Sequence, residues 1–225
     1  MISKILDFLF PNYCGICGKK INERYTCENC LNILECYIER ALMHTESKAY
    51  YDKLICLFEY NGIMKQRMLQ YKFNDKKYIS KTFAESIFYK LKKYNFKADY
   101  IVPVPISKRR MFERGYNQSE CISRFLSKLT GIKMVNNCLV KVKNNSMQSS
   151  LSAAQRKINV KNVYAVTNKE IIKDKTIILF DDIFTTGATM NECAKVLKSA
   201  GAKEVIALAL MYSVKWSKEV QKWTN

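Results

Sequence analysis

The segment from residue 176 to residue 201 constrains the fold of this chain more than any other part of the sequence. An apolar run over residues 176–180 is typical of a buried strand, and two carboxylates, Asp181 and Asp182, follow it directly. A threonine-rich turn then leads into an amphipathic helix that we expect to end at Gly201. Open α/β sheets bind ligands at the carboxyl ends of their strands, and a helix N-terminus attracts phosphate. The candidate phosphate-binding residues of the turn are Thr185, Thr186, Gly187, Ala188 and Thr189.

The acid pair narrows the kind of ligand that this turn would take. Two carboxylates repel a phosphate unless they accept hydrogen bonds from sugar hydroxyls or approach a metal ion. The pattern therefore favours a phosphorylated ribose, and the alternative is an ordinary surface turn with two solvated aspartates. No lysine follows Gly187, so the turn is not a P-loop, and its spacing differs from the G-x-G-x-x-G of dinucleotide folds.

The rest of the chain supports an α/β fold with a mostly parallel sheet. Short apolar runs over residues 54–60, 100–104 and 205–211 predict further strands buried on both faces. Residues 79–93 and 117–130 carry apolar side chains at helical spacing between those strands. Residues 1–10 predict a short amphipathic helix that packs on the protein or lies on a membrane surface. No apolar run approaches the ~20 residues of a transmembrane helix, so we expect a cytoplasmic protein, with the inner face of the membrane as an alternative site.

Four of the nine cysteines form two C-x2-C pairs, which are Cys14 with Cys17 and Cys27 with Cys30. Each pair can present two thiolates on one tight turn, and two such turns complete a tetrahedral site. We therefore predict a structural Zn²⁺ in a small front module, with an iron centre or two disulfides as alternatives. The predicted organisation is a zinc-ribbon-like module over residues 1–45, an α/β domain over residues 46–215 and a basic aromatic tail over residues 216–225.

The net charge of +18 favours a polyanionic partner, although a solvated basic surface would give the same figure. Two clusters, residues 63–77 and residues 107–116, place lysines and arginines beside aromatic side chains. Cations interleaved with aromatic rings suit single-stranded DNA, which binds by backbone attraction and base stacking. The alternative is that the cations serve the phosphorylated ribose and the rings fill the core.

Several motifs resemble those of a known family. The run FDDIFTTGAT at residues 180–189 is similar to the signature of type I phosphoribosyltransferases, which bind phosphoribosyl diphosphate (PRPP). Residues 60–73, the run DYIVPVP at residues 99–105 and the run RGYNQ at residues 114–118 resemble the ComF family more narrowly. Gln148, Arg156 and residues 159–160 continue the pattern, and the four cysteines are also a ComF feature.

The resemblance implies a type I phosphoribosyltransferase (Rossmann-like) fold, a PRPP site and a role in DNA uptake. Asp181 and Asp182 would hold the ribose hydroxyls, directly or through Mg²⁺, and residues 185–189 would hold the 5′-phosphate. A basic loop over residues 143–161 would cover the site. The remaining residues that the resemblance and the basic clusters assign to PRPP are Lys72, Pro105, Ser107, Lys108 and Arg114.

What the resemblance leaves open is whether PRPP is only bound or also turned over. Purine salvage enzymes of the superfamily usually place an aspartate where Thr185 stands, so a simple purine transferase is disfavoured. One alternative is a competence-type protein that binds PRPP and single-stranded DNA, with a DNA-translocation helicase as a further expected partner. The other is an active phosphoribosyltransferase with an unknown nitrogen acceptor.

Overall fold

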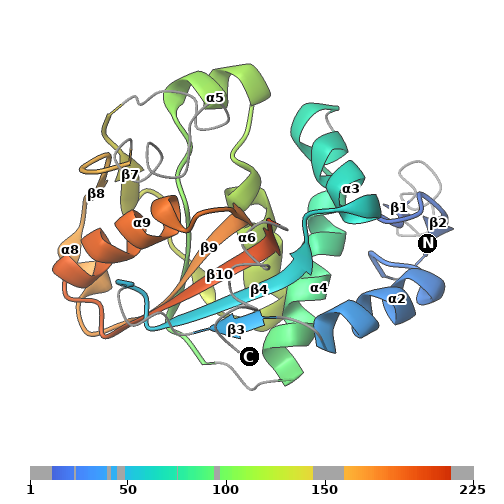
Figure 1. The fold of residues 1–225 in the computed structure, drawn as a ribbon, viewed down its shortest axis with the longest axis horizontal. Helices are drawn as coiled ribbons and strands as arrows, with labels where there is room; N and C mark the ends of the chain where they lie inside the picture. Colours follow the sequence, from blue (N-terminus) through green and yellow to red (C-terminus); the bar gives the residue numbers. More distant parts are fainter. Residues whose placement is uncertain are drawn as a thin grey trace, which may run out of the picture.

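A single six-stranded sheet organises the fold, in the order β3-β4-β10-β9-β5-β6 (Figure 1). The computed structural model describes residues 12–22, 24–39, 42–44, 49–74, 76–93, 97–143 and 160–213. Strands β4, β10, β9, β5 and β6 run parallel to one another, and β3 pairs antiparallel with β4 at one edge. The strands of this sheet are β3 (Leu42–His44), β4 (Lys53–Glu59), β5 (Tyr100–Pro103), β6 (Lys133–Met134), β9 (Thr176–Phe184) and β10 (Glu204–Tyr212).

The central strands are apolar along most of their length because both of their faces are covered. In β9, Ile178 and Phe180 pack into one hydrophobic core, whereas Ile177 and Leu179 pack into a second core on the opposite face. All four side chains are fully buried. The near-continuous apolar runs of the sequence follow from this two-sided burial, so the predicted parallel α/β sheet is confirmed.

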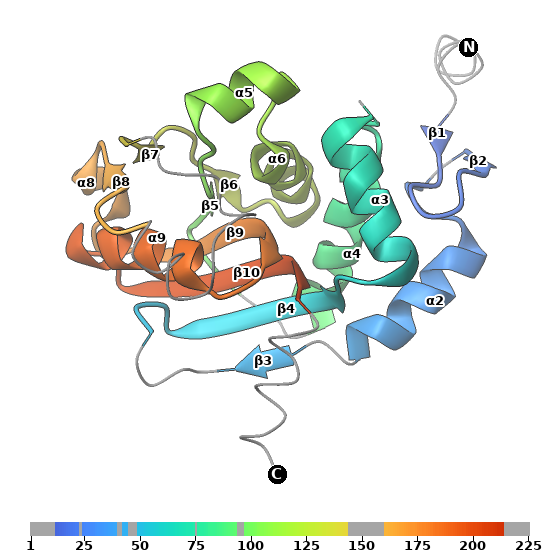
Figure 2. The same ribbon diagram turned by 45° about the horizontal axis from the view of Figure 1, so that its top comes forward.

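Helices cover the two faces of the sheet (Figure 2). One face carries α4 (Ile79–Lys93) and α6 (Gln118–Thr130), with α3 (Gly62–Phe73) beside α4. The other face carries α9 (Ala188–Ser199) and α8 (Lys169–Ile172), next to the hairpin of β7 (Leu139–Lys141) and β8 (Tyr164–Val166). Both predicted helices, over residues 79–93 and 117–130, are therefore present as α4 and α6. None of the described helices combines the length and apolar character needed to cross a bilayer.

A short helix, α5 (Lys108–Arg114), stands above the carboxyl ends of the strands and has no counterpart in the sequence-based prediction. It buries none of its side chains, so it lacks the apolar spacing from which a helix is predicted. The residues at its two ends carry helix-capping signals instead. Ser107 caps the first turn by accepting from the N–H of Arg110 at 3.2 Å, and Gly115 closes the helix with φ of 72°.

The amino-terminal part consists of a hairpin of β1 (Asn12–Tyr13) and β2 (Lys20–Ile21), followed by α2 (Glu28–Glu39). It lies against α4, because the N–H of Gly15 donates to Thr82 Oγ1 at 3.0 Å and Thr26 Oγ1 donates to Glu85 Oε2 at 2.7 Å. A Cβ at position 15 would lie 2.5 Å from Thr82 Oγ1, so this approach requires glycine. The front part and the sheet thus share one hydrophobic core.

Three sequence-based expectations fall outside the described residues: the helix over residues 1–10, most of the loop over residues 143–161, and the tail over residues 216–225. The proposed division at residue 45 stays a prediction. Strand β3, which precedes that boundary, belongs to the main sheet through its pairing with β4.

Candidate functional site

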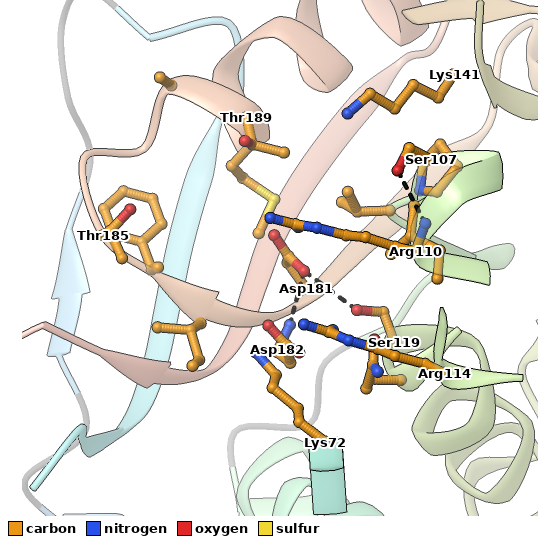
Figure 3. Close-up of a pocket in the computed structure, with 18 of the residues that line it drawn as sticks. Lys72, Ser107, Arg110, Arg114, Ser119, Lys141, Asp181, Asp182, Thr185 and Thr189 are labelled. Carbon is orange, nitrogen blue, oxygen red and sulfur yellow. Dashed lines mark hydrogen bonds and ion pairs between the residues drawn. The ribbon is translucent and has the colours of Figure 1, made fainter. Parts of the chain in front are cut away.

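A cavity of about 430 Å³ opens at the carboxyl ends of β5 and β9, where open α/β sheets place their ligands (Figure 3). The acid pair lies within β9, which continues through both carboxylates to Phe184 instead of ending at Phe180 as the sequence suggested. Helix α5 forms the opposite wall. The volume is in the range of small-molecule sites, which is roughly 300–1,000 Å³.

The turn after β9 presents a helix N-terminus to the cavity. Gly187 has φ of 69°, and α9 begins at the next residue without a side-chain hydrogen bond at its cap. A Cβ at Gly187 would lie 2.6 Å from the Phe184 ring, so both the backbone angle and the space require glycine. The first N–H groups of α9 have no partners within the helix and lie at the positive end of its dipole, which suits a phosphate.

The two aspartates lie in contrasting electrostatic surroundings. Asp182 forms an ion pair with Lys72, whose Nζ lies 2.7 Å from Asp182 Oδ2, and each of the two side chains is only 13% exposed. Asp181 accepts hydrogen bonds from Ser119 Oγ at 3.1 Å and from the N–H of Asp182 at 2.8 Å. The pKa of Asp181 is nevertheless raised to about 7, first by burial and then by the charge of Asp182. In the ligand-free protein at neutral pH, Asp181 is therefore divided between its neutral and ionised forms.

Three cations face the acid pair across the cavity. Figure 3 shows Arg110 and Arg114 reaching from α5 across the cavity, with Lys141 of β7 pointing into the same space. Within the described residues none of the three forms an ion pair. Burial and then the charge of Arg110 lower the pKa of both Lys141 and Arg114. These cations repel one another, so the cluster that they form is suited to binding a polyanion.

The structure brings most of the predicted PRPP residues to this one cavity. Those that line it are Asp181, Asp182, Thr185, Gly187, Ala188, Thr189, Lys72, Pro105, Ser107 and Arg114. Lys108 and Thr186 do not line it. Lys108 is two residues from Arg110 and so projects about 200° around α5 from it. Thr186 lines a separate cavity behind the turn, and its hydroxyl oxygen accepts from the N–H of Ala188 at 3.5 Å.

The sequence did not identify three of the cavity residues, which are Arg110, Ser119 and Lys141. Arg110 and Ser119 flank the RGYNQ run and could have been suspected from it. Ser119 is fixed by its place in the first turn of α6, where Asn117 Oδ1 accepts from the Ser119 N–H at 3.0 Å. Lys141 reaches the cavity from a hairpin strand about 40 residues before the acid pair, and no local signal marks it.

The four predicted metal ligands gather at one point beside α4. The sulfur atoms of Cys14, Cys17, Cys27 and Cys30 all lie within 4.8 Å of one another. The Cys17 and Cys27 sulfurs are 3.5 Å apart, close to the separation of about 3.8 Å that four Zn–S bonds of 2.3 Å imply. Burial opposes ionisation of Cys14, but backbone hydrogen bonds lower the pKa of its thiol to about 7. The donor set therefore fits a closed, four-coordinate metal.

The chain is similar to known proteins over most of its length. Residues 122–224 match the phosphoribosyl transferase domain family. Competence protein F of Haemophilus influenzae is 30% identical over 202 residues, which cover 87% of this chain and 82% of that protein. This chain belongs to the ComF family. It is also similar to the ComF-type competence protein ComFC of Bacillus subtilis, with 28% identity over 89% of this chain and 78% of the relative.

A shorter match links this ComF chain to the DNA utilization protein YhgH of Escherichia coli, with 33% identity over 107 residues. It covers 48% of this chain and 46% of that protein. The predicted family and fold class are both confirmed: a type I phosphoribosyltransferase fold with a mostly parallel sheet, joined to an amino-terminal four-cysteine cluster.

Proposed function

We propose that this ComF-family chain takes part in competence-type handling of DNA and binds PRPP with Mg²⁺ in the cavity at the carboxyl ends of β5 and β9. The observation that carries the PRPP assignment is the convergence, on one cavity, of a helix N-terminus, an acid pair and three cations without ion pairs among the described residues. The names of the relatives, Competence protein F and DNA utilization protein, support the DNA-related role.

Each chemical part of PRPP matches a different side of the cavity. The 5′-phosphate suits the first turn of α9, where Gly187 leaves the backbone accessible and Thr185 and Thr189 add hydroxyl donors. The ribose hydroxyls suit Asp181 and Asp182 as hydrogen-bond acceptors. The diphosphate suits the cationic wall of Arg110, Arg114 and Lys141, together with Ser107 at the start of α5.

The donor set also fits Mg²⁺ that arrives with the diphosphate. Mg²⁺ is usually held by one or two carboxylates together with substrate phosphates, and it would neutralise part of the ligand's charge. Asp181 must lose its proton to serve as a ligand or acceptor, and Asp182 must share its oxygens with Lys72. The proton on Asp181 and the ion pair of Asp182 with Lys72 thus limit the repulsion between the two carboxyl groups until the ligand enters.

Calorimetric titration with PRPP tests the assignment. We expect binding that requires Mg²⁺ and that strengthens about tenfold from pH 6 to pH 8, because ionisation of Asp181 is completed over this interval. Near pH 6.5 the binding enthalpy should also depend on the ionisation enthalpy of the buffer, because Asp181 releases a proton that the buffer takes up. Heat that is absent in every buffer would exclude the PRPP site, and proton uptake would exclude the role of Asp181.

A second candidate function, binding of single-stranded DNA, is favoured by two exposed phenylalanines on the helices that border the cavity. Phe112 of α5 is 92% exposed and Phe73 at the end of α3 is 64% exposed. Arg114 lies over the Phe73 ring, 5.1 Å from its centroid, and so joins the two helices. Exposed rings beside cations suit stacked bases and a phosphate backbone. Tyr71 and Tyr116, which share the same basic clusters, are buried and serve the core.

Replacing both phenylalanines, as Phe73→Ala/Phe112→Ala, is expected to weaken binding of a single-stranded oligonucleotide about 30-fold or more, because each of the two lost stacking contacts contributes roughly 1–3 kcal/mol. Fluorescence anisotropy over a salt series measures this. Tyr50→Ala provides the control, since Tyr50 is also half exposed but borders the separate cavity behind the turn. If the double variant and the control bound the oligonucleotide with equal affinity, this would refute a DNA-binding path over α5 and α3.

A further inference from the structure

We propose that Arg67 is a positioning residue that couples the four-cysteine cluster to the acid pair through α3. The middle of this helix bonds to the turn that presents Cys14 and Cys17, and its carboxyl-terminal end bonds to the cavity. The proposal deepens the proposed function, because it rests on PRPP as the ligand whose binding is coupled to metal retention.

The contact between α3 and the cysteine turn is made by the guanidinium group of Arg67. Arg67 Nε donates to the carbonyl oxygen of Ile16 at 2.6 Å. Ile16 lies between Cys14 and Cys17, so this carbonyl belongs to the turn that presents two of the four sulfurs. Arg67 Nη1 also donates to Gln70 Oε1 at 2.6 Å, which holds the guanidinium group against its own helix. The backbone of the cysteine turn is therefore tied directly to α3.

The contacts at the cavity end lie one turn farther along the same helix. Lys72 forms the ion pair with Asp182 at 2.7 Å, and Tyr71 OH donates to the carbonyl oxygen of Gln118 at 2.9 Å. Five residues separate Arg67 from Lys72, which is about 7.5 Å of helix axis. A displacement of the cysteine turn is thereby passed to the lysine that balances the acid pair.

Helix α3 packs in the core along one of its sides only. Met64, Met68 and Tyr71 hold one side of the helix in the core, whereas Ile63, Leu69 and Phe73 are exposed. A helix that is packed along a single side can shift as a rigid body by small sliding motions. If metal loading changes the affinity for PRPP, then PRPP must change the affinity for the metal by the same factor.

The coupling predicts a response that a simple tether would not give. If Arg67 only anchored the cysteine turn, its loss would speed metal release by the same factor with and without PRPP. If Arg67 couples the two sites, its loss should remove the effect of PRPP on metal release. The full chain loaded with Zn²⁺ is therefore mixed with an excess of a chromogenic chelator, with and without saturating Mg²⁺ and PRPP, and the release rate is measured.

For the unsubstituted protein we expect PRPP to slow zinc release about fivefold, at the lower end of typical coupling factors. In Arg67→Met, release should be faster and insensitive to PRPP, although calorimetry still detects PRPP binding. Gln66→Met is the matched control, because Gln66 is the exposed neighbour on the same helix, and it should behave like the unsubstituted protein. A fivefold effect that persists in Arg67→Met, or the absence of any effect in a protein that binds PRPP, would overturn the proposal.

A ligand-free arm separates this proposal from the PRPP assignment. As a single substitution, Lys72→Met should speed zinc release about twofold. In the Arg67→Met variant the same substitution should leave the release rate unchanged, because the connection between the two sites is already broken. If PRPP fails to bind but this non-additivity is found, the PRPP assignment fails and the coupling stands. Additive effects of the two substitutions, or a chain that retains no Zn²⁺, would overturn the coupling itself.

Discussion

Replacing Asp181 by asparagine is expected to weaken PRPP binding strongly while it makes the ligand-free protein more resistant to unfolding at pH 8. The carboxylate would accept hydrogen bonds from ribose hydroxyls or ligate Mg²⁺, and the loss of such charged contacts at about 1.5–3 kcal/mol each lowers the affinity about 100-fold. Asparagine keeps an oxygen that can accept from Ser119 and from the N–H of Asp182.

The sign of the stability effect follows from the raised pKa of Asp181. A carboxyl group with a folded-state pKa of about 7 is neutral in the folded protein at pH 5 but ionised in the unfolded chain, so stability falls as the pH rises from about 4 to 7. Asparagine carries no such penalty. The melting temperature of Asp181→Asn should therefore exceed that of the unsubstituted protein by more at pH 8 than at pH 5.

Asp182→Asn is the matched comparison for this effect. It removes the partner of a largely buried lysine, so it should weaken PRPP binding and also lower the free energy of unfolding by about 2 kcal/mol. Thermal melting at both pH values, followed by titration with PRPP, separates the two aspartates. An Asp181→Asn protein that is less stable than Asp182→Asn at pH 8, or that binds PRPP normally, would contradict the electrostatic account of the pair.

Loss of the metal is expected to have the largest effect on stability. We propose that the four sulfurs hold one structural Zn²⁺ per chain, and such sites contribute folding free energy directly. In Cys30→Ser the front part would lose a ligand, and Leu34 and Ile16 would lose their fixed place in the common core. A loss of 3–5 kcal/mol corresponds to a fall of about 10 °C in melting temperature for a chain of this size.

Elemental analysis and thermal melting of the same preparations test this expectation. Cys138→Ser is the control, because Cys138 is equally buried but lies outside the cluster and donates to the carbonyl oxygen of Val135 at 3.8 Å. It should retain one zinc per chain and melt within a few degrees of the unsubstituted protein. A chelator-treated, metal-free protein that melts at the unchanged temperature would contradict a structural role for the metal.

The parts of the fold that could be predicted are those whose cause is local. Buried strands and α4 follow from the spacing of apolar residues, and the turn at Gly187 follows from adjacent acids, threonines and glycine. The four-cysteine cluster follows from the two C-x2-C pairs. In each case the residues that make the structure lie within one short stretch of sequence, so the pattern is visible without knowledge of the tertiary fold.

The parts that could not be predicted depend on distant segments or on exposed ones. Helix α5 buries no side chain, so hydrophobic periodicity could not reveal it. Lys141 reaches the cavity only because the hairpin of β7 and β8 packs beside α9. Residues 73 and 71 both look like aromatic members of a basic cluster, yet Phe73 is exposed and Tyr71 is buried, because their positions two residues apart face opposite sides of α3.

The location of PRPP is the central claim, and a crystal structure of the protein with PRPP and Mg²⁺ tests it most directly. We expect the 5′-phosphate against the first turn of α9, the ribose hydroxyls at Asp181 and Asp182, and the diphosphate among Arg110, Arg114 and Lys141. A ligand found elsewhere on the protein, or a 5′-phosphate bound by the cationic wall with the α9 terminus left unused, would contradict it.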